Sequence, residues 1–187
     1  MHPAPAPTAV LFGLRGCLVQ TMNDNLSPAP GALDTLERLR QQDIPCIWMD
    51  DPGASQGEHL ARVLPHWLPG QTANGSPWPS PNACWHALMS LNSDRLDGCV
   101  LVSGEPRLLQ SGLNAGLWTV GLAACSPSCD LTSRQWQAMS VQEQEITRAK
   151  ATLALFGLGV HSVIDHLEAL DTCLADIAQR RRKGEKP

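Results

Sequence analysis

Short, continuous apolar runs recur along the chain, separated by longer stretches in which apolar residues follow helical spacing. The apolar runs at 8–12, 44–49, 98–102, 118–122 and 161–164 predict strands, and the run at 98–102 (Gly-Cys-Val-Leu-Val) is the clearest. Strands of this continuous apolar type are usual in parallel sheets, whose two faces are both covered. The pattern therefore favours a sheet buried between two layers.

Helices are predicted between these strands. Pro30 opens a helix that runs to about Gln42, with Leu33, Leu36 and Leu39 on one stripe. Further helices are expected at 58–63, 83–91, 142–158 and 166–182, and Pro106 opens one that Gly116 closes. Strand and helix in steady alternation predict an α/β fold of three layers, a Rossmann-like core with a mainly parallel sheet and helices on both of its faces.

Polar segments rich in proline and glycine mark the connections. Residues 1–7 alternate Pro and Ala and predict a flexible tail before a single domain at 8–187. Three further connections are expected: a polar one at 21–29, irregular structure at 65–81 with one short strand at 66–68, and an elaborated polar loop at 123–141.

Composition and charge narrow the class of partner. The chain has 14 basic and 18 acidic residues, a net charge of −4, which gives no general attraction to nucleic acid or to an anionic membrane. No segment is long and apolar enough to span a bilayer, and the N-terminus lacks the features of a signal peptide, so a cytoplasmic protein is expected.

The basic run at 180–183 is explained as the solvated end of a helix. The seven cysteines, Cys125 and Cys129 included, are expected to be reduced thiols.

The end of the first strand is where an open α/β sheet places its ligands and its chemistry. Here that strand runs into a tight turn from Gly13 to Gly16, with Arg15 inside the turn. Neither Gly13 nor Arg15 supplies a nucleophile or a ligand for a divalent cation. The sequence thus predicts a hydrolase-like fold in which the first strand ends without a nucleophile or a metal ligand.

Residues 112–121 (Gly-Leu-Asn-Ala-Gly-Leu-Trp-Thr-Val-Gly), after a buried strand and a helix, resemble the haloacid dehalogenase superfamily. More narrowly they resemble its phosphonoacetaldehyde hydrolases (phosphonatases). The stretches at 30–40, 131–137 and 163–170 and the ending at 183–187 are similar to that branch as well. The resemblance covers nearly the whole chain and implies a haloacid dehalogenase-like core.

The family's catalytic motifs are degenerate in this sequence. The resemblance implies a nucleophilic aspartate, a hydroxyl residue, a basic residue that neutralises phosphoryl charge, and carboxylates that hold Mg²⁺. By this resemblance, the nucleophilic aspartate aligns with Gly13, and the position two residues after it aligns with Arg15. The metal-binding carboxylates align with Gly104 and Leu108. The degenerate positions are Gly13, Arg15, Cys17, Met49, Asp50, Trp78, Gly104 and Leu108.

The resemblance also implies a helical cap, carrying a Schiff-base lysine, between the first two motifs. Only about 25 residues separate Cys17 from Ile44, which is too few for a helical cap, and none of them is lysine. The chain is therefore predicted to lack the cap domain.

These absences together predict a pseudoenzyme without a cofactor, which acts by binding an unknown protein partner or as a homo-oligomer. Arg15 would place a fixed positive charge where the cation sits in the family, and two like charges ~4 Å apart repel by roughly 4 kcal/mol at an effective dielectric constant of 20. Loss of the nucleophile alone removes several orders of magnitude in rate.

Three roles for the charged residues near the first strand stay open. The favoured one is an ion pair of Arg15 with Asp50 or Glu105 that closes the former site. A second is a rebuilt Mg²⁺ site of Asp50, Asp51 and Glu105, serving a residual or relocated phosphatase or phosphonatase, although turn, N-cap and first-turn roles explain these carboxylates better. A third is a sensor in which Arg15 binds a phosphate-like anion without turnover.

Several aromatic residues carry weaker indications. Trp48 and Trp78 fall on former site positions and are expected to fill the cavity, whereas Trp85 either fills the core or forms an exposed patch for a partner. The histidines, among them His86 and His161, are predicted to be structural because no serine or cysteine is placed beside them.

Overall fold

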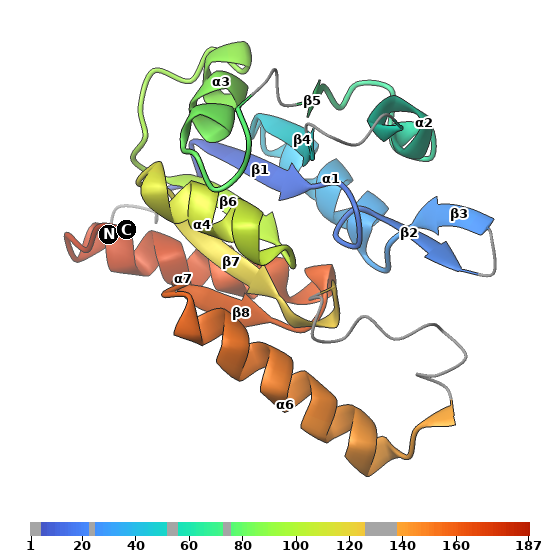
Figure 1. Cartoon of the computed structure of the whole chain (residues 1–187). Helices are drawn as coiled ribbons and strands as arrows, with labels where there is room; N and C mark the ends of the chain where they lie inside the picture. The colour runs from blue at the N-terminus through green and yellow to red at the C-terminus, as the bar shows by residue number, and fades with distance from the viewer. Residues whose placement is uncertain (1–4, 23–24, 52–55, 73–75, 126–137) are drawn as a thin grey trace.

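The computed structural model describes residues 5–22, 25–51, 56–72, 76–125 and 138–187. Six strands form one parallel sheet in the order β5-β4-β1-β6-β7-β8 (Figure 1). The strands are β1 (Ala9–Gly13), β4 (Cys46–Asp50), β5 (Gly70–Thr72), β6 (Cys99–Ser103), β7 (Trp118–Leu122) and β8 (Ser162–Ile164). The predicted parallel sheet is confirmed, with β1 at its centre between β4 and β6.

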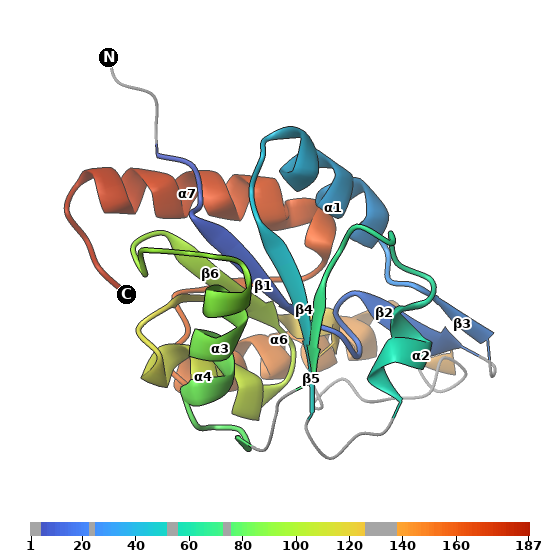
Figure 2. The same ribbon diagram turned by 90° about the horizontal axis from the view of Figure 1, so that it is seen from above.

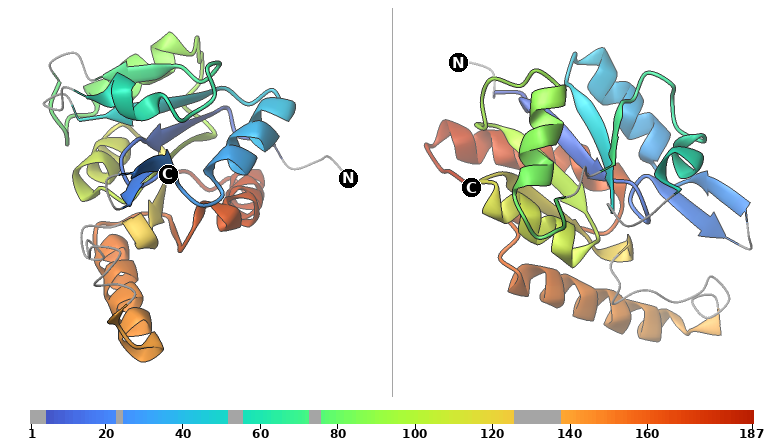
Figure 3. Two further views of the ribbon diagram at one scale, coloured as in Figure 1. Left: turned by 90° about the vertical axis from the view of Figure 1, so that its right-hand side faces the viewer. Right: turned by 45° about the horizontal axis from the view of Figure 1, so that its top comes forward.

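Helices cover both faces of this sheet. They are α1 (Ala32–Gln41), α2 (Gly57–Ala61), α3 (Asn82–Ser90), α4 (Pro106–Asn114), α6 (Val141–Gly157) and α7 (Leu170–Arg182), with short 3₁₀ turns η1 (Ala123–Cys125) and η3 (Leu167–Ala169). Figure 3 (left) shows α1 and α7 on one side of the sheet and α3 and α4 on the other. The three predicted layers are therefore present.

Alternation along β1 explains why both faces are buried. Val10 and Phe12 pack into the cluster that includes α1 and α7, whereas Ala9 and Leu11 pack into the cluster that includes α3 and α4. Successive side chains of a strand point to opposite faces, so a wholly apolar strand needs a helical layer on each side. All five residues of β1 are buried.

The segment between β1 and α1 differs from the predicted polar connection. After a turn, β2 (Val19–Met22) and β3 (Asn25–Pro28) pair as an antiparallel hairpin, which lies beyond the carboxyl end of β1 (Figures 1 and 2). The prediction was wrong because a half-exposed two-stranded hairpin needs little apolar sequence, so its polar residues and proline indicate a loop. The described residues between β1 and α1 contain this hairpin and no helix.

Two further details of the prediction are corrected. The short edge strand lies at Gly70–Thr72 instead of 66–68, and it begins at a glycine because a Cβ at Gly70 would lie 1.8 Å from the Trp48 ring. In α1, Leu36 and Leu39 are buried as expected, but Leu33 is 44% exposed.

The basic C-terminal end of α7 is only partly a solvated helix end. The side chain of Arg181 is 6% exposed and pairs with Asp97 at 2.9 Å. Its guanidinium also donates to the backbone carbonyls of Pro5 and Ala6, at 3.2 and 2.9 Å. The prediction of a solvated terminus is therefore wrong for Arg181, which joins the end of α7 to the segment that leads into β1.

No helix in the described part of the chain has both the length and the apolar character needed to cross a membrane.

His161 lies at the start of β8, away from the carboxyl ends of the strands. Its Nδ1 accepts a hydrogen bond from the backbone N–H of Thr119 at 3.0 Å, and its ring meets the Trp118 ring edge-on at 4.9 Å. Burial, together with the nearby positive charge of Arg180, lowers the pKa of His161 below its ordinary value. These contacts give the histidine a structural environment.

The lowered pKa predicts a pH dependence of stability. As the pH falls below about 6.5, the unfolded chain takes up the His161 proton before the folded chain does, so the free energy of unfolding falls. The variant His161→Asn keeps an acceptor for the Thr119 N–H but cannot be protonated. Urea denaturation between about pH 8 and pH 5 should show a smaller decline for this variant than for the wild type, and equal declines would contradict the assignment.

Candidate functional site

A small cavity of about 140 Å³ opens at the carboxyl ends of β1, β4 and β6. The sequence predicts a site at this edge of the sheet, where parallel strands present their ends to ligands. Its lining comprises Gly13, Leu14, Arg15, Met49, Asp50, Asp51, Trp78, Ser103, Glu105 and Leu108. Six of the eight degenerate positions therefore meet in one cavity.

Gly13 ends β1 at the bottom of this cavity, and its neighbours fill the space that a side chain would need. A Cβ built on Gly13 would lie 2.7 Å from Ser103 Oγ and 3.4 Å from Leu108 Cδ2. Ser103 and Leu108 are both buried. The local packing has closed around a glycine, so a side chain at position 13 requires Ser103 to move.

Arg15 and Asp50 form a two-pronged ion pair across the cavity. Arg15 Nε donates to Asp50 Oδ1 at 2.8 Å, and Arg15 Nη2 donates to Asp50 Oδ2 at 3.1 Å. The Asp50 side chain is 2% exposed, whereas that of Arg15 is 46% exposed. A bidentate pair of this kind fixes geometry as well as neutralising charge. Of the two ion pairs considered from the sequence, the one with Asp50 is observed.

A tight turn after β1 holds Arg15 in position. Leu14 N donates to the Met49 carbonyl on β4 at 2.8 Å, and Gly16 N donates to the Val19 carbonyl at 2.8 Å. Gly16 has φ +71°, a left-handed conformation that glycine adopts without strain. The turn joins β1 to β4 and returns the chain into the hairpin, so Arg15 faces the end of β4.

Glu105 serves the start of α4. It is the N-cap residue, and its carboxylate accepts a hydrogen bond from Arg107 N at 3.1 Å. Ser103 Oγ accepts from Glu105 N at 3.0 Å, which ties this turn to the end of β6. The predicted role of Glu105 at the first turn is thus close to the observed one. Asp50 differs from its predicted turn or N-cap role, because it belongs to β4 and pairs with Arg15.

Apolar side chains form the rest of the wall. Trp78, Met49 and Leu108 are all buried, and Arg107 Nη2 donates to the Trp78 carbonyl. The sequence predicts that Trp78 helps to fill the former site, and it lies in the cavity wall. Trp48 does not line the cavity, because its ring covers Gly70 on β5.

Two degenerate positions lie outside the cavity lining. Cys17 is fully buried, and its Sγ donates to the Val102 carbonyl at 3.6 Å. Gly104 is buried in the turn before α4. Ser103 and Leu14, by contrast, line the cavity and were not among the predicted site residues. The position of Ser103 at the end of the clearest apolar run is the signal that would have identified it.

The residues at the cavity do not fit a magnesium ion. Both carboxylate oxygens of Asp50 are engaged by Arg15, and Gly13, Gly104 and Leu108 offer no side-chain oxygen. Asp51 and Glu105 line the same cavity, yet the described residues contain no group of three His, Cys, Asp or Glu side chains able to hold a metal. Magnesium needs near-octahedral oxygen ligation, and Arg15 adds a positive charge beside the available carboxylates.

No family model matches the chain. Solved structures identify the fold class: the chain superposes on a HAD family hydrolase from Deinococcus radiodurans with a TM-score of 0.65 at 18% identity, over 94% of this chain and 97% of that one. This likeness concerns the fold alone, and it is the fold of a haloacid dehalogenase-type hydrolase.

Sequence relatives give the family. Phosphonoacetaldehyde hydrolase from Salmonella enteritidis is 31% identical over 172 residues, which cover 88% of this chain and 63% of that protein. A phosphonoacetaldehyde hydrolase-like protein from Oleispira antarctica is 29% identical with a TM-score of 0.76, over 86% of this chain and 60% of that one. The chain belongs to the haloacid dehalogenase superfamily and is related within it to the phosphonoacetaldehyde hydrolases. It spans less than two thirds of the length of these relatives.

Another solved structure is similar over its whole length. It is 52% identical to this chain and superposes with a TM-score of 0.90, over 97% of this chain and 100% of that one. The fold described above is thus shared by a second chain of nearly the same extent.

The packing around Gly13 predicts that a side chain at this position lowers the free energy of unfolding. Gly13→Ala should lower the free energy of unfolding by about 1–3 kcal/mol, as overpacking does in a filled core. The loss should shrink in a Ser103→Ala background, because the contact with Ser103 Oγ is then gone. Gly157→Ala is the control, since a Cβ there meets nothing within 4 Å, and it should be neutral or stabilising in urea denaturation. A Gly13→Ala protein as stable as the wild type would contradict the packing.

The ion pair also predicts that the losses of stability caused by changes at its two residues are not additive. Arg15→Met leaves the carboxylate of Asp50 buried without its cation and should lower the free energy of unfolding by about 1–3 kcal/mol, less than a fully buried pair because Arg15 is half exposed. Arg15→Met combined with Asp50→Asn should cost less than the sum of the single changes. The control is Arg95→Met, whose pair with Asp94 is exposed at both ends and should cost under about 0.5 kcal/mol. Additive effects at Arg15 and Asp50 would refute the pairing.

Proposed function

We propose that this chain is a catalytically inactive relative of the phosphonoacetaldehyde hydrolases that acts by binding another protein. The observation that carries the proposal is the bidentate Arg15–Asp50 pair, which occupies the strand-end position where the family resemblance implies nucleophile and cation. The buried carboxylate is neutralised by a guanidinium, so it is not available to attack phosphorus or to hold a metal. Gly13 supports the same conclusion because it carries no side-chain nucleophile and a side chain there would require Ser103 to move.

The absence of a cap supports inactivity independently. The resemblance implies that phosphonatases place a Schiff-base lysine in a helical cap between β1 and the second motif. The described residues there form the β2–β3 hairpin and helix α1, and the sequence of this segment holds no lysine. A substrate aldehyde would therefore meet no amine from this segment.

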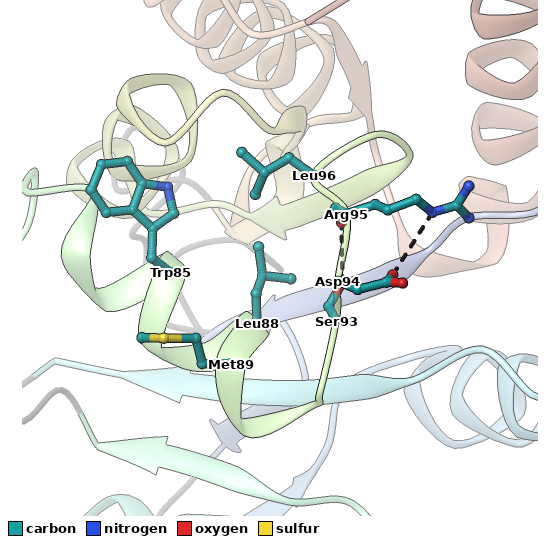
Figure 4. Close-up of a pocket in the computed structure, with 7 residues that line it drawn as sticks. All are labelled: Trp85, Leu88, Met89, Ser93, Asp94, Arg95 and Leu96. Atoms are coloured by element: carbon teal, nitrogen blue, oxygen red, sulfur yellow. Dashed lines mark hydrogen bonds and ion pairs between the residues drawn. The ribbon is translucent and has the colours of Figure 1, made fainter.

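An exposed apolar hollow supports the binding part of the proposal. Trp85 and Met89 on α3 are 41% and 61% exposed, and Leu96 in the following loop is 46% exposed. These side chains line an open hollow of about 230 Å³ together with Asp94 and Arg95. Figure 4 labels the residues that line it. Exposed apolar groups with a polar rim are typical of sites that bind proteins. The exposure of Trp85 supports the second of the two roles predicted for it, an exposed patch for a partner.

A retained or relocated hydrolase is the alternative that the relatives suggest. The observation in its favour is that Asp50, Asp51 and Glu105 share one cavity. The observation against it is that Asp50 pairs with Arg15 and Glu105 caps α4. An anion sensor is less well supported, because two of the Arg15 donors already face Asp50 and three carboxylates line the cavity.

The test is a hydrolysis assay on pure protein. With phosphonoacetaldehyde or an aryl phosphate and excess Mg²⁺, we expect no turnover above that of a buffer blank, while phosphonoacetaldehyde hydrolase from Salmonella enteritidis is the positive control. Gly13→Asp should also be inactive, because the restored carboxylate lacks metal ligands and cap. Mg²⁺-dependent turnover that disappears in Arg15→Ala or Glu105→Ala would overturn the proposal in favour of the relocated hydrolase.

A further inference from the structure

Helix α6 is held to the rest of the fold along one narrow face. Of its 17 residues only Ala151 and Leu155 are buried. Figure 3 (left) shows α6 extending away from the sheet and the other helices. On the rest of its surface, Ile146, Leu153 and Phe156 are 48%, 71% and 50% exposed. These large apolar side chains lie outside the core.

The exposed apolar residues form one continuous stripe. Ile146, the exposed Ala149, Leu153 and Phe156 follow at intervals of three, four and three residues. At about 100° per residue this spacing places them on one face, roughly opposite Ala151 and Leu155. The same spacing defines the a and d positions of a two-stranded coiled coil. One face of α6 is therefore used within the chain, and the opposite face has the pattern of a helix–helix seam.

The charges beside the stripe suit a second copy of the same helix. With Ile146 and Leu153 at a positions, Glu145 occupies a g position and Lys150 the following e position. In a parallel pair, g of one helix faces the next e of the other, so each Glu145 would meet Lys150 of the partner subunit. Neither side chain has an ion pair or side-chain hydrogen bond among the described residues. In an antiparallel pair g faces g and e faces e, which would bring like charges together.

We infer that α6 is a self-association interface, on which two copies of this chain pack as a parallel two-helix coiled coil. A two-fold axis uses the same patch on both copies, and a stripe with self-complementary flanking charges meets that requirement. The helix is preformed, because Ser140 and Glu143 make a capping box at its start. One short helix from each copy gives a small interface, and small interfaces are typical of weak complexes.

This inference goes beyond the function proposed above, because it uses α6 and not the hollow beside α3. Its readout is molecular mass and not hydrolysis, so the two can fail separately. A monomer without turnover would remove the dimer and keep the inactivity, and an active dimer would do the reverse.

The test is sedimentation equilibrium of the full chain over a range from about 1 to 500 µM, a span chosen to bracket weak association. We expect the mass to rise from 20.2 kDa toward twice that value. Leu153→Glu should weaken dimerisation at least tenfold, whereas Leu33→Glu, an equally charged change on the exposed side of α1, should have no effect. Circular dichroism checks that each variant is folded, which is expected because Leu153 is 71% and Leu33 is 44% exposed.

Charge reversal tests the orientation. Glu145→Lys should weaken the dimer, and Glu145→Lys combined with Lys150→Glu should restore it, because the pair is then reversed on both helices. A monomer at every concentration, a dimer that tolerates Leu153→Glu, or a dimer that Leu33→Glu disrupts would overturn the inference. Failure of the double variant to recover would overturn the parallel arrangement.

Discussion

The pairing of Arg15 with Asp50 is the interaction on which this account of the protein depends. Asp50 ends β4 with its side chain almost fully buried, a position that costs free energy unless the charge is matched. Arg15 reaches it only because the turn after β1 is fixed by Leu14 N on the Met49 carbonyl and by the left-handed Gly16. The pair thus links β4 to the turn after β1, at the edge of the sheet where the strands present their carboxyl ends. The loss of chemistry at this edge that we propose follows from the pairing, because both oxygens of Asp50 are then held by Arg15.

Most of the stability of the scaffold comes from apolar burial away from that edge. Val10 and Phe12 face α1 and α7, and Ala9 and Leu11 face α3 and α4, so β1 is buried whatever residue follows it. Burial of apolar surface on both faces of a parallel sheet is the main stabilising contribution. Sequence relatives at about 30% identity and a solved structure with a TM-score of 0.90 share this scaffold. The fold therefore carries no information on activity by itself.

The sequence predicted those strands that are strongly apolar runs and those helices that begin at a proline or end at a glycine. The strand Trp118–Leu122 and the helix closed by Gly116 are read from the sequence alone, because apolar runs and a left-handed glycine each have one common structural solution. The β2–β3 hairpin was not predicted, because its polar residues and proline indicate a loop. The edge strand at Gly70 was misplaced, because its position depends on contact with Trp48 on β4. At the site, the sequence narrowed the partner of Arg15 to two carboxylates. Choosing Asp50 over Glu105 required the structure, because the N-cap of α4 engages Glu105.

The most direct test of the central claim is a crystal structure of the protein grown in excess magnesium with a phosphate analogue. The account predicts that Arg15 Nε and Nη2 remain on the two oxygens of Asp50 and that no cation lies at the ends of β1, β4 and β6. A magnesium ion coordinated by Asp50, Asp51 or Glu105, with Arg15 turned away from the cavity, would contradict it.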